Sequence, residues 1–94
     1  TRGIKIIGAT LTPFGNETFL PGAWNPVREA HRVAVNNWIR ESSALDGVAD
    51  FDQALRDPEC PTQMLPIYDC DDGLHPSDLG YCKMGDAIDL ALFD

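Results

Sequence analysis

Hydrophobic residues along this 94-residue chain fall into short blocks that alternate between strand and helix periodicity. Residues 4–9 are β-branched and almost continuously apolar, which is typical of a strand covered on both faces in a parallel sheet. Asn25 and Pro26 then predict a helix start, with the asparagine as cap and the proline at the first helical position. We expect this helix to end near Ser42 and Ser43.

One stripe of the predicted helix is apolar at helical spacing, whereas Arg28, Arg32 and Asn36 lie off it. We expect the stripe to face the core. Its members are Val27, Ala30, His31, Ala34, Val35 and Trp38. On this stripe His31 is expected to be a core or interface histidine rather than a ligand.

A second apolar strand is predicted at 48–51, after an Asp-Gly turn. The order strand, helix, strand implies one parallel, right-handed βαβ unit. Residues 52–66 are rich in turn formers, with a single helical turn at 53–56. A final helix is predicted over 77–93, with Ser77 as its cap. Its expected buried stripe is Met84, Ala87, Ile88, Ala91 and Leu92.

Two strands cannot complete a sheet of this type, so the first strand is expected to have a neighbour on its other edge. An exposed apolar edge pairs readily with another chain. The chain also begins without an initiator methionine or the regions of a signal peptide, and we expect a processed or excised product. Its 94 residues allow one small domain or part of a larger one.

The net charge of −8, from 15 acidic against 7 basic side chains, repels nucleic acid and anionic membrane surfaces. Charges interrupt every apolar run, so no membrane span is expected. The three cysteines contain no C-x-x-C pair, which argues against a zinc or thioredoxin-like site. We expect a Cys60–Cys70 disulfide if the protein matures in an oxidising compartment, with Cys82 buried and free.

The segment 72–76 (Asp-Gly-Leu-His-Pro) places a carboxylate and an imidazole at a short, fixed spacing. Hydrolytic chemistry often needs a base that titrates near neutral pH and an acid that orients it. Asp72 and His75 supply both, on a loop that enters the final helix. None of the three serines lies in the context of a nucleophile.

Four segments of the chain match one family in order and spacing, and they are residues 8–14, 32–40, 47–52 and 72–81. With them the chain resembles the C-terminal part of the SGNH (GDSL-type) serine esterases and acylhydrolases. The resemblance implies a flavodoxin-like three-layer α/β/α sandwich with a parallel sheet. Residues 1–94 would be a partial domain, comprising its last two strands and last two helices.

For function, the resemblance implies a carboxylic ester hydrolase in which His75 and Asp72 are catalytic and no cofactor or metal is used. The G-D-S and G-x-N-D motifs that carry the family's serine and oxyanion hole do not occur in this sequence. The chain alone is therefore expected to be inactive. The nucleophile would come from a complementary N-terminal half, or the chain would pair with a second copy. Two stretches resemble secreted esterases most, so we expect a secreted protein.

Several other interpretations stay open at this stage. Thr10 and Thr12, at the end of the first strand, would either contact substrate or cap the strand–loop junction. Phe14 and Trp24 would either wall a cleft or cover the sheet edge. A divalent metal could instead bind the acidic cluster Asp69, Asp71, Asp72, His75 and Asp78, although its spacing does not fit an EF-hand. Finally, the chain could be a non-catalytic assembly module that pairs through its exposed strand.

Overall fold

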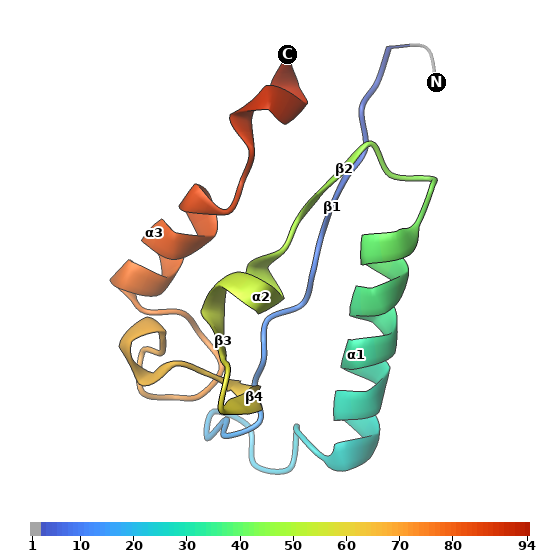
Figure 1. Ribbon diagram of the computed structural model, residues 1–94. Helices are drawn as coiled ribbons and strands as arrows, with labels where there is room; N and C mark the ends of the chain where they lie inside the picture. The colour runs from blue at the N-terminus through green and yellow to red at the C-terminus, as the bar shows by residue number, and fades with distance from the viewer. Residues whose placement is uncertain (1–2) are drawn as a thin grey trace.

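The computed structural model describes residues 3–94, which form a small mixed α/β domain (Figure 1). Thr1 and Arg2 lie outside the described residues. Within them, a two-stranded parallel sheet pairs β1 (Ile7–Ala9) with β2 (Gly47–Ala49). A two-stranded antiparallel sheet pairs β3 (Arg56–Asp57) with β4 (Cys60–Met64). The helices are α1 (Pro26–Glu41), α2 (Phe51–Leu55) and α3 (Asp78–Asp86), with 3-10 turns η1 (Pro66–Tyr68) and η2 (Leu90–Phe93).

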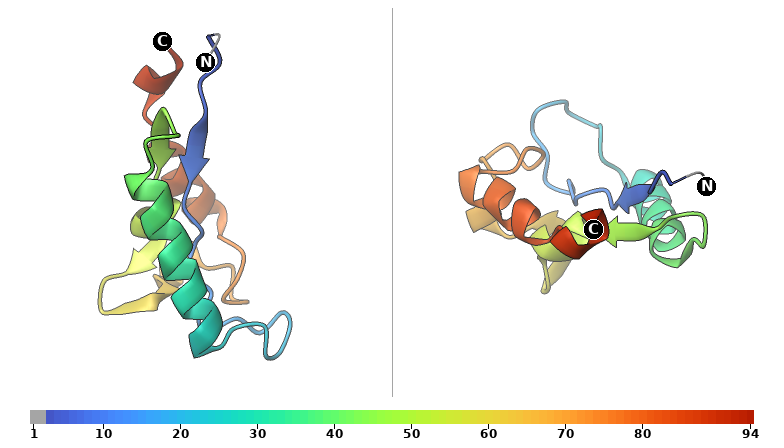
Figure 2. Two further views of the ribbon diagram at one scale, coloured as in Figure 1. Left: turned by 90° about the vertical axis from the view of Figure 1, so that its right-hand side faces the viewer. Right: turned by 90° about the horizontal axis from the view of Figure 1, so that it is seen from above.

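The predicted βαβ unit is confirmed as a parallel pair. β1 and β2 run in register from Ile7 opposite Gly47 to Ala9 opposite Ala49. Both strands are shorter than predicted, and the second ends at Ala49 because Asp50 caps α2 instead, its carboxylate accepting from the Gln53 amide at 3.1 Å. Figures 1 and 2 show the strand pair standing between α1 on one side and α3 on the other.

Helix α1 begins and ends where the sequence predicts. The side-chain oxygen of Asn25 accepts a hydrogen bond from the Arg28 amide at 2.9 Å, and Pro26 occupies the first turn. Its last residue, Glu41, directly precedes Ser42.

The prediction of which face α1 buries is wrong. Val27, Val35 and Trp38 are 64%, 44% and 61% exposed, and the other members of the stripe, His31 included, are also exposed. The face turned toward the strands instead carries Arg32 and Asn36, which are 4% and 0% exposed. The described chain thus covers the polar side of its longest helix and leaves the apolar side in solvent.

The second half differs from its prediction in two places. Residues predicted as irregular form the β3–β4 hairpin, whose turn is closed by the Glu59 amide donating to Asp57 at 2.9 Å. The final helix is capped by Ser77 as predicted but stops at Asp86. Asp89 caps the separate turn η2 by accepting from the Ala91 amide, so a new helical turn begins at Leu90 instead of α3 continuing to the end of the chain.

Little of the core is apolar. Among the described residues, the buried hydrophobic side chains are Ala49, Leu55 and Met64. Within the stripe predicted for 77–93, Met84, Ala87, Ile88 and Leu92 are half-buried and Ala91 is exposed. No helix in the described part of the chain is long and apolar enough to cross a bilayer.

Candidate active site in the Asp72–His75 loop

The segment 69–76 between η1 and α3 forms a closed loop. The two ends of the loop, which we call its neck, are joined by the bridge between Asp69 and Pro76. The Cys70 amide also donates to the His75 carbonyl across the neck, at 3.0 Å. Inside the loop, one carboxylate oxygen of Asp69 accepts from the amides of Asp71 and Gly73, both at 2.9 Å. The loop backbone is therefore fixed by its own hydrogen bonds before any ligand is present.

The long loop after β1 packs against this segment. The Thr18 amide donates to the Asp72 carbonyl at 2.7 Å. Gly73 has a φ of 70° and lies so close to the backbone of Asn16 and Glu17 that a Cβ would overlap it. A side chain at position 73 would push the two loops apart, so glycine is required by conformation and by space.

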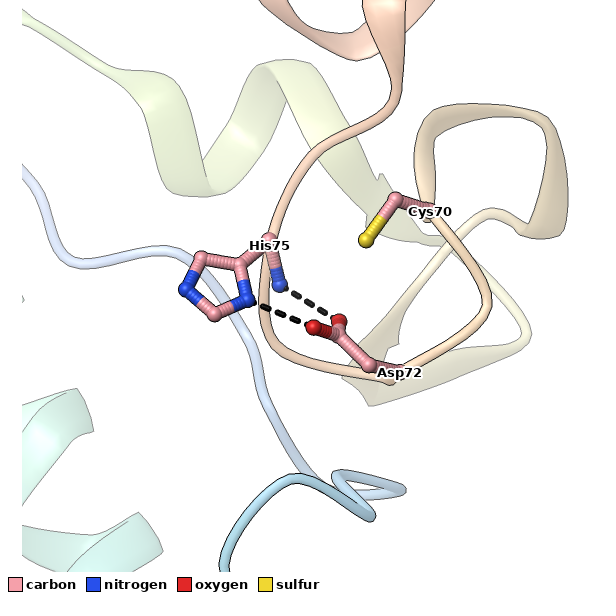
Figure 3. A group of neighbouring side chains, drawn as sticks. All are labelled: Cys70, Asp72 and His75. Carbon is pink, nitrogen blue, oxygen red and sulfur yellow. Dashed lines mark hydrogen bonds and ion pairs between the residues drawn. The ribbon is translucent and has the colours of Figure 1, made fainter.

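Asp72 holds His75 through both of its oxygens (Figure 3). Oδ1 accepts from the amides of Leu74 and His75, each at 2.8 Å, and Oδ2 lies 2.5 Å from His75 Nδ1. The hydrogen bond with the His75 ring, followed by the two amide bonds, holds the pKa of Asp72 well below its usual range. An ionised carboxylate only accepts, so in the neutral imidazole the proton lies on Nδ1 and Nε2 is the acceptor.

The imidazole is directed outward from this anchored carboxylate. The His75 side chain is 50% exposed, and Phe19 packs edge-on against it with ring centroids 5.3 Å apart. Nε2 lies on the ring edge away from Asp72 (Figure 3). The predicted pair is therefore assembled, with a basic nitrogen available to an incoming group.

Cys70 is a neighbour that the sequence reasoning missed. Its thiol lies beside Asp72, and the ligand atoms of Cys70, Asp72 and His75 all lie within 4.8 Å of one another (Figure 3). Partial desolvation, together with the Asp72 carboxylate, raises the pKa of this thiol. The sequence predicts Cys70 as half of a disulfide, and the spacing C-x-D-x-x-H is the signal that places this thiol in one loop with Asp72 and His75.

The three cysteines are free thiols, so the predicted Cys60–Cys70 disulfide is not formed. The Cys60 sulfur instead lies 3.7 Å from the hydroxyl of Thr62. Cys82 is exposed on α3, and the expectation that it is buried is wrong. The oxygen-rich metal cluster is also not assembled: in the described part of the chain, Asp69, Asp71 and Asp78 join no group of converging ligand atoms.

Thr10 takes part in a second charged cluster rather than in the loop. Its buried hydroxyl donates to Asp50 at 2.8 Å and accepts from the Asp52 amide at 2.9 Å. This contact fits the capping interpretation. Substrate binding by Thr10 and Thr12 stays a prediction. The indole of Trp24, which is half-buried, donates to Glu29 at 3.0 Å.

That second cluster, which we call the arginine cluster, lies between α1 and α2. The carboxylate of Asp52, 4% exposed, contacts Arg32 at 2.6 Å, Arg40 at 2.8 Å and Arg56 at 3.0 Å. Arg40 also pairs with Asp50 at 2.7 Å, and its hydrogen bond lowers the pKa of Asp50 to about 2. The sequence reasoning did not predict this cluster.

Neither of the two main hollows contains the histidine. The larger, of about 590 Å³, lies between β2, α2 and α3 and is lined by residues such as Val48, Gln53 and Ala87. The smaller, of about 300 Å³, is lined by Asn16 of the long loop after β1 and by Gly73 of the loop 69–76, and its lining does not include Asp72 or His75. A substrate bound at His75 would therefore have to be enclosed by residues other than those that line these two hollows.

Comparison with known proteins found no matching family model and no similar curated protein.

Proposed function

We propose that this chain supplies the histidine and aspartate of a Ser-His-Asp triad in a carboxylic ester hydrolase of the SGNH type. The observation that carries the proposal is the geometry of Asp72 and His75, with Oδ2 2.5 Å from Nδ1 and the opposite ring nitrogen turned outward. This is the arrangement that a general base and its orienting acid require.

In the proposed reaction, Nε2 of His75 takes the proton of a serine hydroxyl as that oxygen attacks the ester carbonyl. His75 then delivers the proton to the leaving alcohol. Asp72 fixes the tautomer and stabilises the imidazolium that forms, while its other oxygen is held by two amides. Two backbone amides are well suited to this task because they keep the carboxylate still during the proton transfers.

The serine must come from outside the segments described here. Ser77, the serine nearest the pair in sequence, donates to the Ile67 carbonyl at 2.8 Å and accepts from the Gly80 amide at 3.1 Å. Its hydroxyl is thus used in starting α3. We therefore propose a complementary segment that carries the G-D-S serine. The resemblance to secreted esterases is the basis for proposing secretion as well.

In the finer fold that we propose, the chain is the last βαβα part of a flavodoxin-like sandwich. The parallel strand pair between α1 and α3 supports this layout (Figure 2). Within residues 3–94, β1 pairs with β2 alone, and Ile6 beside it is 50% exposed. A strand of the complementary segment added to this edge would extend the sheet and shield that side chain.

A second candidate, a non-catalytic assembly module, is favoured by the exposed apolar stripe of α1, where Trp38 is 61% exposed. In that case the chain would associate through α1 and β1 with a second copy of itself, and the Asp72–His75 pair would have no catalytic role.

Ester hydrolysis by the natural protein that contains this sequence separates the two candidates. With short p-nitrophenyl esters, His75→Ala should lower kcat by several orders of magnitude, whereas His31→Ala, at the exposed histidine of α1, should retain it. Equal activity of both variants and the parent would refute the catalytic role. The isolated 94-residue chain should be inactive, since none of the three serines in its sequence lies in the context of a nucleophile.

A further inference from the structure

The loop that holds Asp72 and His75 also gathers three kinds of metal-binding atom. A thiol sulfur from Cys70, a carboxylate oxygen from Asp72 and an imidazole nitrogen from His75 lie within 4.8 Å of one another (Figure 3). In the described part of the chain, no other group of three or more such side chains converges in this way. The Ser-His-Asp mechanism makes no use of the sulfur.

These three side chains project from a backbone that is already fixed. Cys70 and His75 face each other across the neck, where the Cys70 amide donates to the His75 carbonyl at 3.0 Å. Asp72 is held through Oδ1 by two amides, so Oδ2 is the oxygen left for a ligand. Hydrogen bonds to one oxygen of a ligating carboxylate are the usual outer-shell support of a metal site.

The cluster is also open to an incoming ion. Cys70 and His75 are exposed and Asp72 is half-buried. The net charge of −8, with Asp69 and Asp71 in the same loop, attracts cations to this end of the molecule.

We propose that Cys70, Asp72 and His75 bind one divalent cation of the zinc class, with water completing a four-coordinate site. The mixed sulfur, nitrogen and oxygen set matches the ligands of Zn²⁺ and of Co²⁺ in its place. Mg²⁺ and Ca²⁺ prefer sets made of oxygen alone, so they should bind far more weakly. On coordination the thiol gives up its proton to the solvent, and the Nδ1 proton of His75 moves through solvent to Nε2, so that the ion takes the position of the hydrogen bond between Asp72 and His75.

This inference does not rest on the proposed esterase activity, but it has a consequence for it. An ion held by Nδ1 removes the contact through which Asp72 would orient the imidazole. The metal-bound form and the form that acts as a base therefore exclude each other.

The first test is protection of cysteines from alkylation in the unmodified chain. Iodoacetamide labelling followed by peptide mass mapping, with and without Zn²⁺, reports each thiol separately. Zn²⁺ should slow labelling of Cys70 more than tenfold and leave labelling of Cys82, which is also exposed, unchanged, and Mg²⁺ should protect neither. Equal labelling of Cys70 with and without Zn²⁺, or equal protection of Cys70 and Cys82, would overturn the proposal.

The second test is Co²⁺ titration, which gives a thiolate-to-metal charge-transfer band only when sulfur is a ligand. Cys70→Ser should abolish that band and His75→Ala should weaken binding by at least about tenfold. The matched variants Cys82→Ser and His31→Ala should titrate like the parent. A band that survives Cys70→Ser, or loss of the band in Cys82→Ser, would contradict the assignment. Neither assay contains an ester, so its outcome is separate from that of the hydrolase proposal.

Discussion

Asp52 and Asp72 are both aspartates that bind a basic side chain at short distance, yet their surroundings differ in almost every respect. Asp52 is 4% exposed, and its two oxygens bind three guanidinium groups. Asp72 is 23% exposed, and its partner His75 is 50% exposed. The Asp52 carboxylate faces three guanidinium groups in the interior, whereas the loop has an outward-facing ring nitrogen and a nearby thiol. The buried ion pairs of Asp52 are suited to stabilising the fold, whereas the exposed Asp72–His75 pair can react with an incoming group.

The largest effect is expected when the loop carboxylate is neutralised. In Asp72→Asn the amide oxygen would still accept from the two backbone amides, so the NH₂ would face His75 Nδ1 and force the proton onto Nε2. The natural protein should then lose about 10³- to 10⁴-fold in kcat for p-nitrophenyl esters. Asp71→Asn, at the exposed neighbour, is the matched control. If both variants lose the same small amount, Asp72 does not orient the base.

The same substitution in the arginine cluster should act on stability. Asp52→Asn removes the buried carboxylate that three arginines share and leaves Arg32, which is 4% exposed, with Glu29 as its remaining counter-charge. Breaking such a buried pair costs about 3–5 kcal/mol. Urea unfolding at one fixed protein concentration measures the change, because association would move the midpoint. The exposed Asp86→Asn should stay within about 0.5 kcal/mol of the parent. A similar small change in Asp52→Asn would mean that the cluster is not part of the stable fold.

Acid should weaken the arginine cluster in a defined window. The pKa of Asp50 is lowered to about 2, chiefly by its hydrogen bond with Arg40. Its stabilisation is therefore fully present above the ordinary aspartate pKa and is lost as the pH falls from about 4 to about 2, a contribution of about 2 kcal/mol. Asp72 also titrates low, so the contribution of Asp50 is the difference between the parent and Asp50→Asn. If the free energy of unfolding falls by the same amount in the parent and in Asp50→Asn between about pH 4 and about pH 2, Asp50 does not make this contribution.

The smallest effect on stability is expected at the exposed stripe of α1, where association should change instead. Trp38→Gln should alter the free energy of unfolding of a single chain by less than about 0.5 kcal/mol, because the indole is 61% exposed. If the stripe is covered by a second copy or by a complementary segment, the variant should associate less in light scattering. Tyr81→Gln, at a 55% exposed aromatic of α3, is the control. Identical scattering by the parent and both variants would exclude the stripe as an interface.

Local signals predicted where α1 and α3 begin. Asn25 and Pro26 define the start of α1, and Ser77 defines the start of α3, because caps act within one helical turn. The separation of Asp72 and His75 by three residues likewise predicted their contact. These features depend only on neighbours in the chain.

Long-range pairing could not be predicted in the same way. Helical periodicity shows that Val27, Val35 and Trp38 share a face, but it does not say whether this segment or another covers that face. Burial of the opposite face follows from the ion pair between Arg32 and Asp52, which lie 20 residues apart in sequence. Cys70 was missed for a related reason: a search for C-x-x-C pairs overlooks a thiol that shares its loop with an aspartate and a histidine.

The central claim is that His75 activates a serine that other residues supply, and labelling with a fluorophosphonate tests it most directly. In the natural protein, we predict that the label falls on a serine outside residues 1–94. Its rate of attachment should collapse in His75→Ala and stay unchanged in His31→Ala. Attachment to Ser42, Ser43 or Ser77, or an equal labelling rate in both histidine variants, would contradict the account.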